Sequence, residues 1–128
     1  MENIDNMIKV AVTFLRSKGY SNFFITGSVA LIKNFGIPLG REPKDIDIIL
    51  LGDTTNEEDD KILFKLDGIL VNVFIQKEIN FRKSKLIDNV RFIDDIQQII
   101  NEKLKMSRDK DLEDIEVINK FLAEKKLQ

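Results

Sequence analysis

The sequence predicts a single α/β domain (α+β by some conventions), with a small mixed β-sheet and helices packed on it. The chain has 128 residues and is 43% hydrophobic, which suffices for one domain with a core. Short apolar runs alternate with stretches of helical periodicity. Asp67-Gly68, between two of the apolar runs, is a strong β-hairpin signal. We expect residues 1–93 to form the core of the domain and residues 94–128 to form a C-terminal pair of helices.

The composition excludes several kinds of site. Charged residues make up 33% of the chain and the net charge is -2, so nothing indicates a basic nucleic-acid surface. Cysteine and histidine are both absent, which excludes disulfides, thiolate sites, the commonest general base and the usual zinc ligand. Any bound metal would be held by oxygen atoms, which suits Mg²⁺ or Mn²⁺. No segment has the pattern of a membrane span or a signal peptide, so a cytoplasmic protein is the default expectation.

Periodicity and punctuating residues place the individual elements. Short apolar runs predict buried strands, and apolar residues three or four positions apart predict helices. Gly19 and Gly36 are natural helix ends, whereas Asp94 or Asp95 and then Ser107 are natural helix caps. In chain order we expect helix 4–18, strand 23–26, helix 29–35, strands 45–51, 62–66, 69–75 and 90–93, a helix ending near 106 and a helix ending near 125.

The second half of the chain carries further expectations. The acidic stretch 52–60 predicts a solvated loop, and residues 76–89 predict a solvated connection with a short helix. The short apolar run Val90–Ile93 predicts an edge strand. Helical spacing predicts two core-facing stripes, formed by Ile96, Ile99, Ile100 and Leu104 in one helix and by Leu112, Ile115, Ile118, Phe121 and Leu122 in the other.

Asp45 and Asp47 are the strongest candidates for chemistry. They lie two residues apart on a predicted strand, so both carboxylates point to the same face while Ile46, Ile48 and Leu50 point into the core. Adjacent carboxylates repel each other, and Mg²⁺ commonly binds one or two carboxylates together with substrate phosphates.

Gly27-Ser28 precedes this strand at a helix start. Glycine lets the backbone approach a ligand closely, and N–H groups at a helix start favour anions, so the pair is a candidate phosphate site. Ser28 could alternatively serve only as a helix cap. Arg41, in the connection, is either an exposed loop charge or a partner of phosphate or of the two carboxylates.

The order of strand, Gly27-Ser28, helix, loop and Asp45-Ile46-Asp47 resembles the nucleotidyltransferase superfamily, with its polymerase-beta-like fold. Arg41, a few residues before Asp45, makes the chain look most similar to minimal and abortive-infection-type bacterial nucleotidyltransferases. A second match lies in residues 103–115, where Lys, Arg, Lys-Asp and Asp recur as in the helix that follows the family's core.

The resemblance implies roles for these residues. Asp45 and Asp47 would hold Mg²⁺ (or Mn²⁺) that bridges a nucleoside triphosphate, and Gly27 and Ser28 would bind its outer phosphates. Lys103 would lie by the triphosphate, although a lysine at a helix end also simply complements the helix dipole. The resemblance also makes three residues candidates for bracing Lys103 and Arg108 near the site, namely Lys110, Asp111 and Asp114.

Asn72 is the main departure from the family, because the resemblance places a third carboxylate there. An amide cannot take a proton from an attacking hydroxyl, although its carbonyl oxygen can ligate a metal weakly. Asn72 could also be a buried amide that bonds the neighbouring backbone. Asp67 and Glu78 lie at the edges of the same strand, and we do not expect either to substitute.

The resemblance therefore leaves different classes of function open. One is transfer of a nucleoside monophosphate from a nucleoside triphosphate to a hydroxyl acceptor, which could be a protein, an RNA or a small molecule. The alternative is a catalytically impaired member that acts as a nucleotide binder or as a protein-interaction module. A homodimer or a partner protein is compatible with each of these, and no membrane association is expected.

Overall fold

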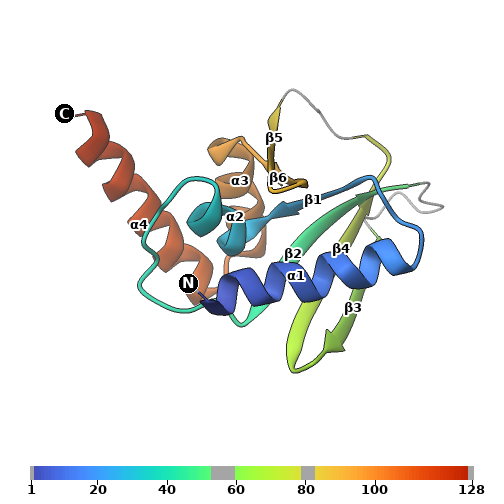
Figure 1. The fold of residues 1–128 in the computed structure, drawn as a ribbon. Coiled ribbons are helices and arrows are strands. Elements are labelled where there is room, and N and C mark those ends of the chain that lie inside the picture. Colours follow the sequence, from blue (N-terminus) through green and yellow to red (C-terminus); the bar gives the residue numbers. More distant parts are fainter. Residues whose placement is uncertain (1, 53–59, 79–82, 127–128) are drawn as a thin grey trace.

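The computed structural model describes residues 2–52, 60–78 and 83–126. Within this part of the chain, four helices and six strands confirm the predicted fold class, a mixed β-sheet flanked by helices (Figure 1). The elements are α1 (Glu2–Ser17), β1 (Phe23–Thr26), α2 (Gly27–Lys33), β2 (Asp45–Leu51), β3 (Asp60–Leu66), β4 (Ile69–Gln76), β5 (Ser84–Ile87), β6 (Val90–Ile93), α3 (Ile96–Met106) and α4 (Asp109–Lys126).

The strand order of the sheet is β3-β4-β2-β1-β6-β5. β2 lies between β1, to which it is antiparallel, and β4, to which it is parallel. The register pairs Asp47 with Thr26 on one side and with Asn72 on the other. The Asp-x-Asp strand is therefore central, and residues that lie far apart in the sequence are brought to the same point of the sheet.

The two faces of β2 have different surroundings. Ile46 and Ile48 are fully buried and belong to the main core, as the sequence predicts. Helix α1 covers this side of the sheet, where the ring of Phe14 lies 4.9 Å from that of Phe64 on β3 (Figure 1). Asp45 and Asp47 are half-buried and point to the opposite face. The alternation of side chains along β2 thus separates the core from the candidate site.

A second hairpin corrects the prediction for residues 76–89. Asp88 and Asn89 both have positive φ, 49° and 67°, as the two-residue turn of a type I′ hairpin requires. The turn joins β5 to β6, so residues 84–87 form a strand rather than a solvated connection. The prediction of an edge strand at Val90–Ile93 was therefore wrong, because β6 lies between β1 and β5. The predicted Asp67-Gly68 hairpin is confirmed, with φ of 48° and 80°.

Two predictions fall partly or wholly outside the described residues. The acidic loop was expected over 52–60, but residues 53–59 are not described and Asp60 already belongs to β3. Of the stretch 76–89 in which a short helix was expected, residues 84–87 form β5 instead, Lys83 is in a 3₁₀ conformation, and residues 79–82 lie outside the described part of the chain. No helix in the described part of the chain is both long enough and apolar enough to cross a membrane.

The end of α3 differs from its predicted stripe. Asp95 caps the helix by accepting from the backbone N–H groups of Gln97 and Gln98. Leu104, predicted in the core, is 49% exposed, whereas Lys103 is only 6% exposed. The helix turns its lysine inward because buried acidic partners on α4 are available to it.

The junction of α3 and α4 also differs from prediction. Ser107 does not cap α4; it ends α3 in a left-handed conformation, with φ of 52°. Asp111 instead accepts a hydrogen bond from the backbone N–H of Arg108, just before α4 begins. Leu112 is 46% exposed, so it lies outside the predicted stripe, while Ile118 is fully buried. These corrections share one cause, since charged residues rather than apolar ones occupy the interior of this junction.

Candidate functional site

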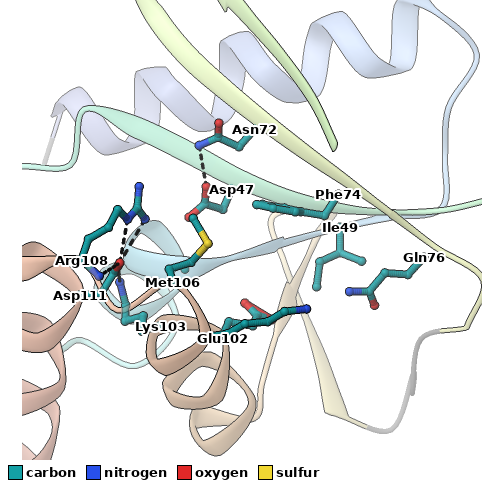
Figure 2. A pocket seen from close by; sticks show the side chains of 12 residues that line it. Asp47, Ile49, Asn72, Phe74, Gln76, Glu102, Lys103, Met106, Arg108 and Asp111 are labelled. Atoms are coloured by element: carbon teal, nitrogen blue, oxygen red, sulfur yellow. Dashed lines mark hydrogen bonds and ion pairs between the residues drawn. The ribbon is translucent and has the colours of Figure 1, made fainter. Parts of the chain in front are cut away.

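Asp45, Asp47 and Asn72 lie together on two adjacent strands. The Asn72 amide nitrogen Nδ2 donates to Asp45 Oδ2 at 3.0 Å and to Asp47 Oδ1 at 2.8 Å. Asn72 is 5% exposed, and Figure 2 shows its amide directed at Asp47. The structure thus places all three predicted metal-site residues at one point, with the amide bonded to the carboxylates rather than to the neighbouring backbone.

Asp47 lies in surroundings that shift its pKa. Burial, and then the negative charge of Asp45, raise the pKa of Asp47 above its ordinary value. The hydrogen bond from Asn72 and the positive charges of Lys103 and Arg108 act in the opposite direction without cancelling the shift. A carboxylate in this setting gains from an additional positive charge, which is the physical case for a cation site.

Gly27 stands directly against Asp47 where α2 begins. Its φ is +67°, and a Cβ placed there would lie 2.5 Å from Asp47 Oδ2. Any side chain would therefore collide with the carboxylate as well as strain the backbone. The sequence predicted close approach of a ligand at Gly27, and the structure shows close approach of Asp47, beside a cavity that Gly27 also lines.

Ser28 and Arg41 meet at a carboxylate of α4. Asp114 Oδ2 accepts from Ser28 Oγ at 3.2 Å, from Arg41 Nη2 at 2.7 Å and from Lys103 Nζ at 2.9 Å. Arg41 is therefore neither a free loop charge nor paired with the two site carboxylates. Ser28 is 7% exposed and does not cap α2, whose N-cap position is Thr26.

The start of α4 and the residue before it bring further charges to the site. Arg108 Nε pairs with Asp111 Oδ2 at 2.7 Å, and Lys110 Nζ lies 3.8 Å from Asp45 Oδ2. Burial raises the pKa of Asp111, but the hydrogen bonds from Arg108 together with the positive charges of Arg108 and Lys103 outweigh burial, so the net shift is downward. The predicted bracing is found, with Asp114 holding Lys103 and Asp111 holding Arg108, whereas Lys110 faces Asp45.

A cavity of about 280 Å³ opens beside Asp47. One end carries Asp47, Asn72, Lys103 and Arg108, and side chains of Ile49, Phe74 and Met106 extend into it (Figure 2). The other lining residues are Gly27, Gln76, Glu102, Lys105 and Asp111. This lining was not predicted from the sequence. Its strand residues could have been predicted, because every second residue after Asp47 on β2 and after Asn72 on β4 points to the same face of the sheet.

Glu102 on α3 is the most informative of the missed residues. Its carboxylate accepts from Thr26 Oγ1 at 3.0 Å and from Gln98 Nε2 at 3.2 Å. Burial raises the pKa of Glu102, with a further upward contribution from Asp47. A carboxylate on a predicted amphipathic helix gave no sequence signal, because only the packing of α3 against β1 turns it inward.

The donor set suits a cation that takes part of its shell from a substrate. Among residues 2–52, 60–78 and 83–126, no group of three or more carboxylates could enclose a metal ion. Asp45 and Asp47 nevertheless converge, since a single atom, Asn72 Nδ2, lies within 3.0 Å of an oxygen of each. Two carboxylates supplemented by substrate phosphates are a usual arrangement for Mg²⁺.

Comparison with known proteins shows similarity in fold but not in sequence family. No protein-family model matches the chain, and no curated protein matches its sequence. The crystal structure of JHP933 from Helicobacter pylori is similar with a TM-score of 0.53 and 16% identity, over 89% of this chain and 65% of that one. The crystal structure of a candidate nucleotidyltransferase from H. pylori has a TM-score of 0.46 and 16% identity, over 81% of this chain and 59% of that one.

The first of these similarities shows that the chain shares its fold with JHP933. The TM-score of the second is too low to carry weight. The chain spans less than two thirds of the length of either structure.

Proposed function

We propose that this chain is a divalent-metal-dependent nucleotidyltransferase that moves a nucleoside monophosphate from a nucleoside triphosphate to a hydroxyl acceptor. The supporting observation is the convergence of Asp45, Asp47 and Asn72 beside a cavity that Lys103 and Arg108 also line. Oxygen donors on one side and fixed positive charges on the other are what a metal-bound triphosphate requires. The motif resemblance, in which Gly27 and Ser28 belong to the phosphate region, points the same way.

The residues present fit Mg²⁺ or Mn²⁺. Asp45 and Asp47 would hold the ion, with the carbonyl oxygen of Asn72 as a weak third ligand after its amide rotates. When bound, the ion would stabilise negative charge on the α-phosphate. The sequence contains no cysteine or histidine that could serve as an alternative metal ligand.

The chain's own residues supply position and charge. Lys103 is fixed by Asp114, and Arg108 by Asp111, so both cations are preorganised and need little rearrangement when phosphate binds. The acceptor hydroxyl oxygen would bond to the α-phosphorus in line as the bond to the leaving pyrophosphate breaks, and the hydroxyl proton would pass to solvent water. Asn72 is neutral and cannot take this proton.

A second function is favoured by the same residue. The Asn72 amide donates to both carboxylates and so offsets their repulsion without any metal. This arrangement suits an impaired member of the fold that binds nucleotide without turnover, or that serves as a protein-interaction module. The variant Asn72→Asp distinguishes the active enzyme from the impaired member, because a third carboxylate would supply both a charged metal ligand and a candidate base.

Calorimetry with ATP, GTP, CTP and UTP in Mg²⁺ or Mn²⁺ tests the proposal. We expect metal-dependent binding in wild type and its loss in Asp47→Asn. Asp67→Asn is the matched control, because it removes the same charge at an exposed hairpin position where Asn-Gly is as favourable as Asp-Gly.

Transfer of α-labelled nucleotide then distinguishes enzyme from binder. Transfer that Asp47→Asn abolishes supports the enzyme, whereas transfer that appears only with Asn72→Asp supports the impaired reading. No binding of any nucleotide by a folded sample would contradict both and leave the interaction module.

A further inference from the structure

The strand β3 forms one end of the six-stranded sheet (Figure 1). It pairs with β4 along one side, and no strand among the described residues pairs with its outer side. β3 has seven residues, as many as the central strand β2, whereas β5 at the other end of the sheet has four. A long edge strand presents a row of backbone N–H and C=O groups that can pair with another chain. The outer side of β3 is therefore a candidate interaction surface.

The β3–β4 hairpin determines which backbone groups lie on this outer side. In a hairpin with a two-residue type I′ turn, here Asp67-Gly68, the residues that flank the turn exchange both backbone hydrogen bonds. Leu66 thus bonds to β4, and so does every second residue before it. The backbone N–H and C=O groups of Leu63 and Lys65 point away from β4 instead. These are the groups to which a further antiparallel strand would bond.

Large apolar side chains lie beside these outward-pointing groups. Leu63 is 57% exposed and Ile62 is 48% exposed. Because adjacent residues of a strand point to opposite faces, both faces of the sheet are apolar at this point of the edge. Pairing with a further strand would remove both side chains from water, which favours an occupant that is itself a strand.

We propose that β3 pairs with β3 of a second copy of this chain, antiparallel and with Phe64 on the two-fold axis. Leu63 then faces Lys65 of the other copy, whose apolar stem can cover it. On the opposite face of the sheet, Ile62 meets Leu66 of the other copy as a cross-strand apolar pair. This proposal does not depend on the proposed enzymatic activity.

Charge favours this register over the two nearest alternatives. Centred on Leu63, the pairing would set Lys65 opposite position 61, which is also a lysine, and centred on Lys65 it would set that lysine opposite itself. Like charges directly opposite each other are destabilising. Centred on Phe64, the pairing sets position 61 opposite Asp67, so a lysine faces an aspartate. The strand is thus complementary to itself in both apolar and charged positions, which is why a second copy is the occupant.

Sedimentation velocity of the full chain, at concentrations that span the micromolar range, tests the pairing. One strand pair is at the small end of stable interfaces, so we expect a dimer that dissociates on dilution. Leu63→Lys sets like charges opposite each other twice in a symmetric dimer and should weaken it about tenfold. Adding Lys65→Glu should restore the dimer, because each new lysine then faces a glutamate of the other copy. Leu86→Lys, at a comparably exposed leucine of β5, is the control and should leave the dimer unchanged.

Disulfide cross-linking reports the register directly, because the sequence contains no cysteine. Under oxidation, a mixture of the Leu63→Cys and Lys65→Cys proteins should give cross-linked dimers, since directly opposite residues lie within disulfide distance. Neither variant should cross-link to itself, because its two cysteines would be offset along the strands.

Three results would overturn the proposal. The first is a wild-type protein that stays monomeric throughout the concentration range. The second is a dimer that Leu63→Lys leaves intact, which would place the interface elsewhere. The third is self-cross-linking of either cysteine variant without cross-linking of the mixture, which would require a different register.

Discussion

Gly27→Ala should damage the protein in a way that Gly36→Ala does not. The two glycines flank α2 and have nearly equal φ, +67° and +65°. An alanine in this conformation costs about 1–2 kcal/mol at either place. At Gly36 a Cβ meets nothing within 4 Å, whereas at Gly27 it would lie 2.5 Å from Asp47 Oδ2. Because a forced contact of this kind adds about 1–3 kcal/mol, we expect Gly27→Ala to lose about 2–5 kcal/mol in total.

Thermal unfolding followed by circular dichroism measures this difference. With about 4 °C per kcal/mol for a domain of this size, Gly36→Ala should lower Tm by about 4–8 °C and Gly27→Ala by about 8–20 °C. In an Asp47→Ala background most of the excess should disappear, because the carboxylate oxygen at 2.5 Å is gone and only the contact with the Cβ of that residue, at 3.2 Å, remains. Metal-dependent nucleotide binding should be lost in Gly27→Ala and kept in Gly36→Ala. Equal Tm losses for the two variants, or an excess that is undiminished in the Asp47→Ala background, would refute the steric explanation.

Three further variants test other parts of the structure. Asp114→Asn leaves Lys103 buried without its main counter-charge, so urea unfolding should show a loss of about 3–5 kcal/mol. Asp95→Ala removes the cap of α3 and should cost about 1 kcal/mol at neutral pH. The hydrogen bond from Lys83 lowers the pKa of Asp95, so the Asp95 contribution should be present above the unfolded-state pKa and should vanish in unfolding curves as pH falls through the folded value. Leu104→Gln should change stability by less than about 0.5 kcal/mol, and a large loss would contradict the exposure of Leu104.

Local patterns predicted the fold where a single physical rule dominates. Buried apolar runs gave the positions of the central strands, and Asp67-Gly68 gave the β3–β4 hairpin. The β5–β6 hairpin was missed because Asp88-Asn89 lacks the glycine that marks most type I′ turns. The strand order could not be predicted, because β1 pairs with β6, which lies far from it in the sequence. No local sequence pattern encodes such a pairing.

The candidate site was predicted as residues but not as a set of interactions. Period-two alternation placed Asp45 and Asp47 on one face correctly. Helical periodicity assigned Leu104 to the core, and this prediction is wrong because Leu104 is 49% exposed. Lys103 does lie in the last turn of α3, as predicted, but its burial was not foreseen because its partner Asp114 lies on a different helix. Glu102 was overlooked because a carboxylate on a helix is ordinarily solvated, and only its packing beside Thr26 makes it a wall of the cavity.

Asp111 and Asp114 of α4 explain how the site keeps its carboxylates accessible while cations lie nearby. Lys103 and Arg108 are both close enough to lower the pKa of Asp47, yet Asp114 and Asp111 hold them through hydrogen bonds of 2.9 Å and 2.7 Å. If these cations were free, direct ion pairing would neutralise Asp47 and close the cavity beside it. Because Asp114 and Asp111 hold the two cations, the positive charges of Lys103 and Arg108 act on Asp47 although neither side chain pairs with it directly. A ligand that brings its own cation and its own negative phosphates then finds both halves of its charge pattern already in place, which is the property expected of an electrostatically preorganised site.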